Sequence, residues 1–222
     1  MMASLPHENW HWNTEDCSRF VKLGCDFKSA SFHPMPHFSM SGVRGTQVLN
    51  NGRYFWELRV SKSMFVNGVM FGIATRNLPL QISYPAHITQ NQGWLLSHNG
   101  NLWHAQGFTH YTQSFCHNEV TSIGVLFDGI SGRLSYYING RYLGVAFEGL
   151  NDVKEDLYPV VFSSSGNTVI ALTKMSKEFV NLQDRCRAVI LKRIKVKAQI
   201  EILHLPTPIK EYIMEPLDDV EI

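Results

Sequence analysis

The stretch RLSYYINGRYLGVAF, residues 133–147, decides the fold class of this chain. Leu134 and Tyr136 alternate with Ser135, which is the period-two pattern of a strand with one buried face. Asn139-Gly140 follows, the dipeptide that best tolerates the positive φ angles of a type I′ turn, and an apolar stretch then returns. The sequence therefore predicts a β-hairpin.

Similar turn signals divide the chain on both sides of this hairpin, from about residue 17 to residue 172. Many short strands with regular turns are typical of an antiparallel sandwich, and 222 residues with 12% aromatic side chains are enough to fill a large core. We therefore predict a mainly β fold. The turn signals lie at Asn50-Asn51-Gly52, Asn99-Gly100-Asn101, Asp128-Gly129 and Ser131-Gly132.

Composition excludes several classes of function. The net charge of +1 gives no long-range field that attracts nucleic acid or a membrane surface, so neither is an expected partner. The four cysteines form no C-x-x-C pair, which argues against a zinc site and against a disulfide framework. No signal core and no apolar run of about 20 residues is present. We expect a soluble intracellular protein, cytoplasmic or nuclear, with reduced thiols.

One motif mimics a metal site. HENWH at 7–11 fits the H-E-x-x-H pattern, in which His7 and His11 would bind zinc and Glu8 would act as the base. Pro6 and the nearby terminus leave no preceding turns to hold such a helix, and Trp10 indicates anchoring on the sandwich. We therefore predict no metal and no cofactor, with a zinc hydrolase as a weak rival.

The composition changes after residue 178. The stretch LQDRCRAVILKRIKVKAQIEIL has no glycine and is dense in helix-forming residues, with Leu182, Cys186, Val189 and Ile190 on one face. A second short helix is expected beyond Pro206. About 40 residues with two apolar faces cannot bury both internally. The tail therefore needs a partner surface, either its own sandwich or another protein.

The body of the chain resembles the SPRY domain. The resemblance covers about Trp10 to Lys174 and implies a bent, B30.2-like antiparallel β-sandwich that serves as a protein- or peptide-binding module rather than as an enzyme. It rests on the ordered runs RYFWELRV, VMFGIAT, QGWLLS, VTSIGVLFDGISGRLSYYINGRYLGVAFEGL and DLYPVVFSSSG.

The tail resembles a SOCS box, a small α-helical module. Leu182-x3-Cys186-x3-Ile190 fits the segment that binds the elongin B/C adaptor, with Asn181 where a small residue is usual. The resemblance implies an adaptor-binding set of Leu182, Cys186, Val189 and Ile190.

The family's cullin-selecting segment reads Leu-Pro-Leu-Pro before an aliphatic and an aromatic residue. Here His204 replaces the first proline. The resemblance implies cullin 5 as the partner, with cullin 2 as the alternative, and a cullin-binding set of Leu205, Pro206, Ile209 and Tyr212.

Together the two parts resemble the SPRY domain-containing SOCS box proteins, and the pattern CD...FH...RGT...FWE is most similar to the type-three branch. The expected division is a SPRY unit over 1–178, a SOCS box over 179–216 and a tail over 217–222. The resemblance implies a non-catalytic substrate receptor of a cullin–RING ubiquitin ligase that binds a short linear degron. The alternative is a SPRY interaction scaffold whose C-terminal helices pack on its own sandwich.

Three segments are candidates for holding the degron. FHPMPHFSM (32–40) combines prolines with apolar groups that are costly to leave in water, although Phe32 and Phe38 would equally cap the sandwich. In the long polar loop 78–93, Tyr84 matches a family tyrosine that contacts an extended, asparagine-bearing peptide. Serines replace a Val-Trp pair of the better-known branch in FSSSG (162–166). The candidate residues are Met35, Pro36, Phe38, Tyr84, Pro85, Ala86, Ser164, Ser165 and Gly166.

Overall fold

The computed structural model divides the chain into two compact units, Met1–Glu178 and Phe179–Ile222. Among the residues that the structure describes, no helix is long and apolar enough to cross a membrane. These residues are 9–33, 39–50, 52–61, 68–83, 92–105, 107–115, 120–164, 166, 168–178, 190, 200 and 202–214.

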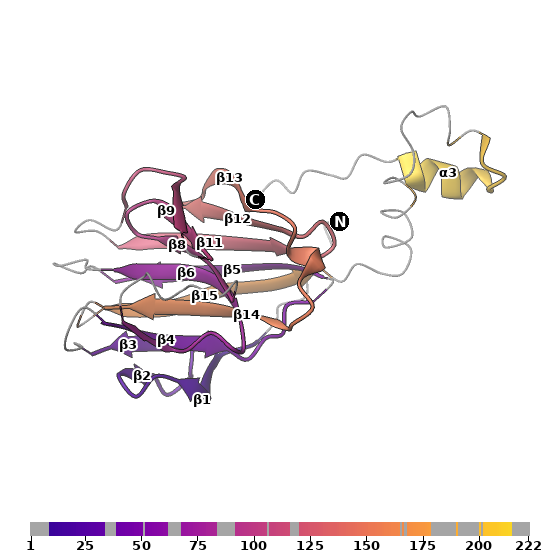
Figure 1. Ribbon diagram of the computed structural model, residues 1–222. Helices are drawn as coiled ribbons and strands as arrows, with labels where there is room; N and C mark the ends of the chain where they lie inside the picture. Colours follow the sequence, from indigo (N-terminus) through magenta and orange to yellow (C-terminus); the bar gives the residue numbers. More distant parts are fainter. Residues whose placement is uncertain are drawn as a thin grey trace. The chain divides into compact units, whose positions relative to one another are not determined.

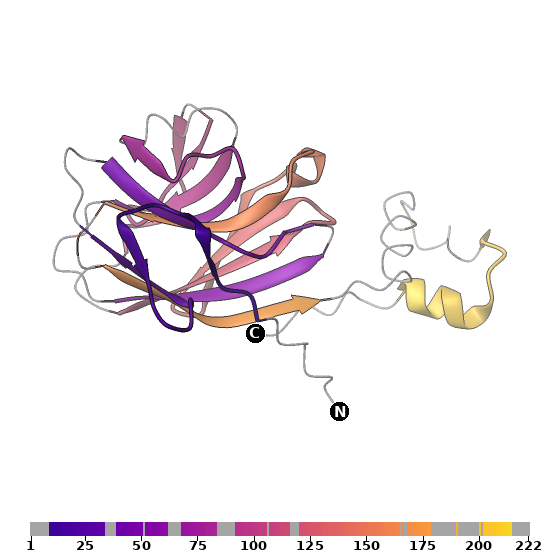
Figure 2. The same ribbon diagram turned by 90° about the horizontal axis from the view of Figure 1, so that it is seen from below.

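The first unit contains two antiparallel sheets, which Figure 1 shows from the front and Figure 2 shows as two layers. In its described residues, one sheet has eight strands in the order β1-β4-β14-β6-β8-β9-β10, with β7 paired to β4. Its strands are β1 (Trp12–Cys17), β4 (Ser39–Gly45), β6 (Val69–Thr75), β7 (Gln81–Ser83), β8 (Gly93–Ser97), β9 (Asn101–His104), β10 (Gly107–His110) and β14 (Leu157–Ser163).

The other sheet has seven strands in the described part of the unit, in the order β13-β12-β11-β5-β15-β3-β2. A short 3-10 helix, η2 (Leu150–Asp152), follows its last hairpin. The strands are β2 (Val21–Leu23), β3 (Ser29–Phe32), β5 (Arg53–Val60), β11 (Thr121–Asp128), β12 (Arg133–Ile138), β13 (Arg141–Phe147) and β15 (Val169–Glu178).

The predicted hairpin is confirmed. Strands β12 and β13 pair from Ile138 and Arg141 outward, and the two residues between them have φ angles of 50° at Asn139 and 79° at Gly140. Two consecutive positive φ angles are the requirement of a type I′ turn. The predicted mainly β sandwich is confirmed as well.

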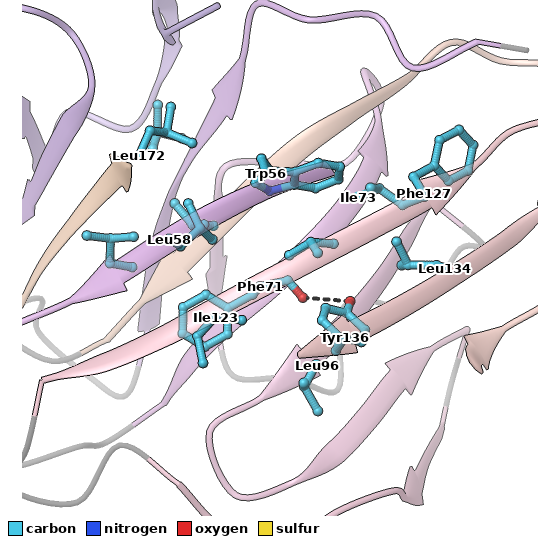
Figure 3. Packing of buried hydrophobic residues seen from close by; sticks show 14 of the residues in the cluster. Trp56, Leu58, Phe71, Ile73, Leu96, Ile123, Phe127, Leu134, Tyr136 and Leu172 are labelled. Carbon is cyan, nitrogen blue, oxygen red and sulfur yellow. Dashed lines mark hydrogen bonds between the residues drawn. The ribbon is translucent and has the colours of Figure 1, made fainter. Parts of the chain in front are cut away.

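The main core lies between the two sheets (Figure 3). Alternation produces it directly on β5, where Trp56 and Leu58 are buried and their neighbours are less so. The hydroxyl of Tyr136 on β12 donates to the carbonyl oxygen of Phe71 on β6 at 3.0 Å and so links the two sheets. A buried hydroxyl thereby gains the partner that its desolvation demands.

A second apolar cluster lies on the outer face of the eight-stranded sheet. Strand β6 is buried at every position, so Met70 and Ala74 face this cluster while Phe71 faces the main core. Continuous apolar runs such as VMFGIAT are typical of strands that are covered on both faces. The buried members of the outer cluster are Met40, Met70, Ala74, Leu78, Ile82, Leu95, Val160 and Phe162.

In the second unit, helix α3 spans Thr207–Met214. The carbonyl oxygen of Pro206 accepts hydrogen bonds from the amides of Ile209 at 3.0 Å and Lys210 at 3.2 Å, so the helix begins directly after this proline. Pro208 lies in the first turn, where a missing N–H costs little. The predicted short helix beyond Pro206 is confirmed.

Candidate functional site

One end of the sandwich gathers several strand ends of the eight-stranded sheet (Figure 1). Ser163, the last residue of β14, pairs with Ser41 of β4 and with Val69, the first residue of β6. Ser83, the last residue of β7, pairs with Ser39, the first residue of β4. These strand ends therefore lie side by side.

The three predicted peptide-binding segments adjoin these strand ends. Segment 34–38 precedes β4, segment 84–91 follows β7, and segment 164–166 follows β14. The topology thus brings to one end of the sandwich the described strand ends that flank three segments far apart in the sequence. Residues 34–38, 84–91 and 165 themselves lie outside the described residues.

Ser164 is held in place by the backbone at the start of β6. Its amide donates to the carbonyl oxygen of Gly68 at 2.9 Å, and its hydroxyl oxygen lies 3.4 Å from the same atom. Gly68 has a φ of 78°, and an added Cβ would lie 2.8 Å from the Ser164 hydroxyl oxygen. The position therefore requires glycine for both its backbone conformation and its close contact. The half-buried Ser164 and Gly166 are the predicted peptide-binding residues that the structure describes.

Several serine residues lie at this end of the sheet, two of them buried and two half-buried. Ser41 is fully buried and donates from its hydroxyl to the carbonyl oxygen of Ser163 at 3.2 Å. The half-buried Ser39 and Ser164 continue this set toward solvent. Hydroxyls and peptide groups together can both donate and accept hydrogen bonds.

A backbone hydrogen bond joins the two ends of the segment between β6 and β8. The amide of Thr75 donates to the carbonyl oxygen of Gln92 at 2.8 Å, which closes the segment into a loop. Leu78 and Ile82 are 2% and 3% exposed and belong to the outer apolar cluster. The expectation of an uninterrupted polar loop over 78–93 was wrong, because Gln81–Ser83 forms strand β7 on the edge of β4.

The tail exposes apolar surface. Ile202 is 74% exposed and Ile209 on α3 is 45% exposed, whereas Ile200 and Ile213 are each 2% exposed. Ile190, a predicted adaptor contact, is helical and half-buried.

Two further members of the predicted cullin-binding set are described in this unit. Leu205 is half-buried and Pro206 is exposed.

Many predicted binding residues remain predictions. The adaptor set falls mostly on residues that the structure does not describe, and the side chain of Tyr212 is likewise outside it. Outside the described residues lie Met35, Pro36, Phe38, Tyr84, Pro85, Ala86, Ser165, Leu182, Cys186 and Val189, together with His7 and Glu8 of the H-E-x-x-H motif.

Two of the described titratable groups, Cys17 and Tyr136, have pKa values that are raised mainly by burial. Burial, and second the nearby Asp16 carboxylate, raise the pKa of the Cys17 thiol to about 11, so this thiol is a poor nucleophile at neutral pH. Burial raises the pKa of Tyr136 well above its ordinary value. The Nδ1 atom of His11 lies 2.9 Å from the carbonyl oxygen of Trp12. In the described part of the chain, no three His, Cys, Asp or Glu side chains cluster as metal ligands.

Comparison with known proteins matches this architecture to a family. The SPRY domain family matches residues 53–175, which is more than half of the chain. SPRY domain-containing SOCS box protein 1 of Bos taurus is 30% identical over 222 residues, covering 91% of this chain and 79% of the relative. The chain belongs to the SPRY domain-containing SOCS box protein family. This confirms the resemblance drawn from the sequence.

Within the SPRY domain-containing SOCS box family, the chain is similar to the type-three branch. SPRY domain-containing SOCS box protein 3 of Xenopus laevis is 26% identical over 216 residues, covering 94% of this chain. The chain spans 58% of the length of that relative. A solved structure, the SPRY domain of human HERC1, superposes with a TM-score of 0.58 at 19% identity, covering 73% of this chain and 97% of that domain. This likeness shows the fold.

Sequence reasoning missed two features that stabilise the candidate-site end of the sandwich, Gly68 and the outer apolar cluster. The signal for the cluster was present in the unbroken apolar runs of β6 and β14, since strands that face water on one side alternate. The dipeptide Asn67-Gly68 carried an unused signal for a positive φ. The close contact of Gly68 with Ser164 carried none, because it arises from sheet pairing.

Proposed function

We propose that this chain is the substrate-recognition subunit of an elongin B/C–cullin–RING ubiquitin ligase. The observation that carries the proposal is the extent of the family similarity. It covers 91% of the chain against the bovine protein and therefore continues past the SPRY domain into the tail. The name of that relative joins a SPRY domain to a SOCS box, and the presence of a second compact unit after the SPRY domain supports the same composition here.

The tail would bind the adaptor through one helix face. Leu182, Cys186 and Ile190 are spaced by four residues, which places them on the same side of a helix. Val189 extends this apolar face beside Ile190. The helical conformation at Ile190 supports this reading. These side chains would fill an apolar pocket of elongin C.

The cullin would bind beyond the adaptor helix, at Leu205, Pro206, Ile209 and Tyr212. The 45% exposure of Ile209 supports this placement, because an aliphatic side chain on a helix gains free energy when a partner covers it. Cullin 5 is the partner that we propose, with cullin 2 as the alternative.

The serine-lined end of the sandwich would bind a short, extended degron. Segments 34–38, 84–91 and 164–166 adjoin neighbouring strand ends, so one peptide can reach all three. The resemblance at Tyr84 implies a peptide that bears asparagine, and the half-buried Ser164 hydroxyl supports a polar ligand at this end.

The chain breaks no bond in this function. It holds the substrate near the RING protein and its ubiquitin-charged partner and so raises the local concentration of substrate lysines to about the millimolar range. An encounter between two molecules thereby becomes effectively intramolecular.

Co-expression tests the proposal. The full chain and a version that ends at Glu178 are each expressed with elongin B, elongin C and cullin 5, with cullin 2 in a parallel set. We expect the full chain to form a stoichiometric complex and the shorter version to form none. A full chain that stays monodisperse and binds none of these proteins would instead support the scaffold alternative.

A further inference from the structure

A buried arginine connects β4 of the eight-stranded sheet to the base of the loop 76–92. Arg44 on β4 is 1% exposed and follows Met40 at an even spacing, so it shares the outer face with the apolar cluster there. One Nη1 hydrogen bond goes to the carboxylate of Asp16 on β1. That carboxylate is 25% exposed and is the acidic partner of Arg44 among the described residues.

The other terminal nitrogen binds the loop itself. Nη2 of Arg44 donates to the carbonyl oxygens of Thr75 at 3.0 Å and Leu78 at 2.7 Å. These carbonyls lie three residues apart on the turn that leaves β6, and the amide of Leu78 also donates to Thr75 at 3.3 Å. The planar guanidinium therefore fixes both ends of one turn in a single geometry.

The turn sets where the rest of the loop lies. Directly after it, the carbonyl oxygen of Leu80 accepts the amide of Gly42 at 2.8 Å, and β7 then pairs with the start of β4. Strand β7 ends at Ser83, immediately before Tyr84. A shift of the turn would be transmitted through these few residues to the segment that carries the predicted peptide contacts.

Stability alone does not explain a buried cation here. Burying a guanidinium is costly, and replacing a buried ion pair by apolar groups of similar size is often neutral or stabilising. The Nε of Arg44 and the hydroxyl oxygen of Thr75 are both buried without a hydrogen-bond partner in the described structure. The arrangement is therefore incompletely satisfied as a stabilising network.

We propose that Arg44, neutralised by Asp16, is a positioning residue for the peptide-recognition loop. The guanidinium holds the base of the loop 76–92 and, through Leu80 and β7, preorganises the strand end at Ser83 that directly precedes Tyr84 in the sequence. Preorganisation lowers the ordering cost of binding and so strengthens capture. The step to peptide capture rests on the proposed function.

Hydrogen–deuterium exchange on the full chain tests the positioning step without any peptide. Arg44→Met combined with Asp16→Asn removes both charges and nearly preserves shape. We expect the rate of amide exchange over residues 76–83 to rise about tenfold. Local opening of this segment costs less free energy in the variant, because the two hydrogen bonds from Arg44 to the carbonyl oxygens no longer have to break. Unchanged exchange in this segment would overturn the proposal.

Two variants separate positioning from charge and from general stability. Arg44→Lys keeps a positive charge beside Asp16 but loses the planar guanidinium that donates to both carbonyl oxygens. Amide exchange over 76–83 should therefore be raised in this variant too, and exchange at the wild-type rate would overturn the role of the guanidinium. Tyr136→Phe removes a buried hydrogen bond between the sheets, so it lowers the unfolding midpoint and leaves exchange over 76–83 unchanged. A tenfold rise in that control would also contradict the proposal, because the loop would then open only with the whole domain.

The binding arm uses a synthetic library of extended ten-residue peptides with asparagine fixed at a central position. The best binder to the wild-type chain should lose about tenfold affinity for the Arg44→Met/Asp16→Asn variant while the unfolding midpoint stays near that of the wild type. Raised exchange with unchanged affinity would refute the link to capture. If the wild-type chain binds no library member, the proposed peptide-binding function fails, and the exchange result still decides whether Arg44 positions the loop.

Discussion

The amide of Ser164 donates to the carbonyl oxygen of Gly68 at 2.9 Å and thereby joins the end of β14 to the residue before β6. Segments that approach the candidate site from two parts of the sequence meet at this contact. Gly68 holds a φ of 78°, which side chains with a Cβ rarely adopt.

Gly68→Ala is therefore expected to lower the free energy of unfolding by about 1–2 kcal/mol, through left-handed backbone strain and the close contact with Ser164. Chemical denaturation measures this change. Gly107→Ala is the matched control. An added Cβ at Gly107 meets no described atom within 4 Å, and Gly107 does not have the positive φ that Gly68 has. Equal effects of the two substitutions would show that the Gly68 contact is not restrictive.

Tyr84→Ala is expected to weaken binding of the selected asparagine-bearing peptide at least tenfold, because tyrosine contributes contact area and a hydroxyl at low entropic cost. The unfolding midpoint should stay near that of the wild type. Tyr142→Ala offers the same substitution at a 50% exposed tyrosine on the other sheet, and it should leave peptide affinity unchanged. A large fall in the midpoint of Tyr84→Ala would mean that this tyrosine is structural.

Stability should fall in alkaline solution partly through Cys17. Burial raises the pKa of this thiol from 9.0 to about 11, so the unfolded chain releases the thiol proton at a lower pH than the folded chain. The unfolded state is therefore favoured as pH rises through this window, and the stabilisation is complete below pH 9.0. Cys17→Ala should flatten the fall of the unfolding free energy with pH in this range. An unchanged slope would contradict the assignment.

Ile209→Arg should weaken binding of cullin 5 at least tenfold while elongin B/C still co-purifies, because a charge replaces an exposed aliphatic contact on α3. Thr207→Arg adds the same charge two residues earlier, on the other side of the helix, and should have a smaller effect. Surface plasmon resonance with the preformed ternary complex measures both variants. Loss of elongin B/C in Ile209→Arg would place this residue in the adaptor interface instead.

The sequence predicted the fold where local chemistry determines structure. The Asn139-Gly140 turn and the alternation around Trp56 both follow from side-chain period and turn propensity, and both are confirmed. The meeting of three distant segments at one end of the sandwich was not readable, because it depends on strand order and register.

Arg44 shows why the supports of a site escape sequence reasoning. An arginine within a strand ordinarily indicates a solvent-facing position. Its burial here depends on Asp16 and on the turn after Thr75, which sheet pairing brings beside it. The adaptor and cullin sets rest on the resemblance of the tail to a SOCS box and remain predictions.

The central claim is that a foreign subunit covers the apolar face of the tail. Co-purification of elongin B/C with Leu182→Ala/Cys186→Ala tests it most directly, against Asp184→Ala, which lies two positions from both Leu182 and Cys186 and therefore on the opposite helix face. We expect the first variant to lose about 3 kcal/mol or more of association free energy and the second to bind like the wild type. Full retention of elongin B/C by Leu182→Ala/Cys186→Ala would contradict the claim.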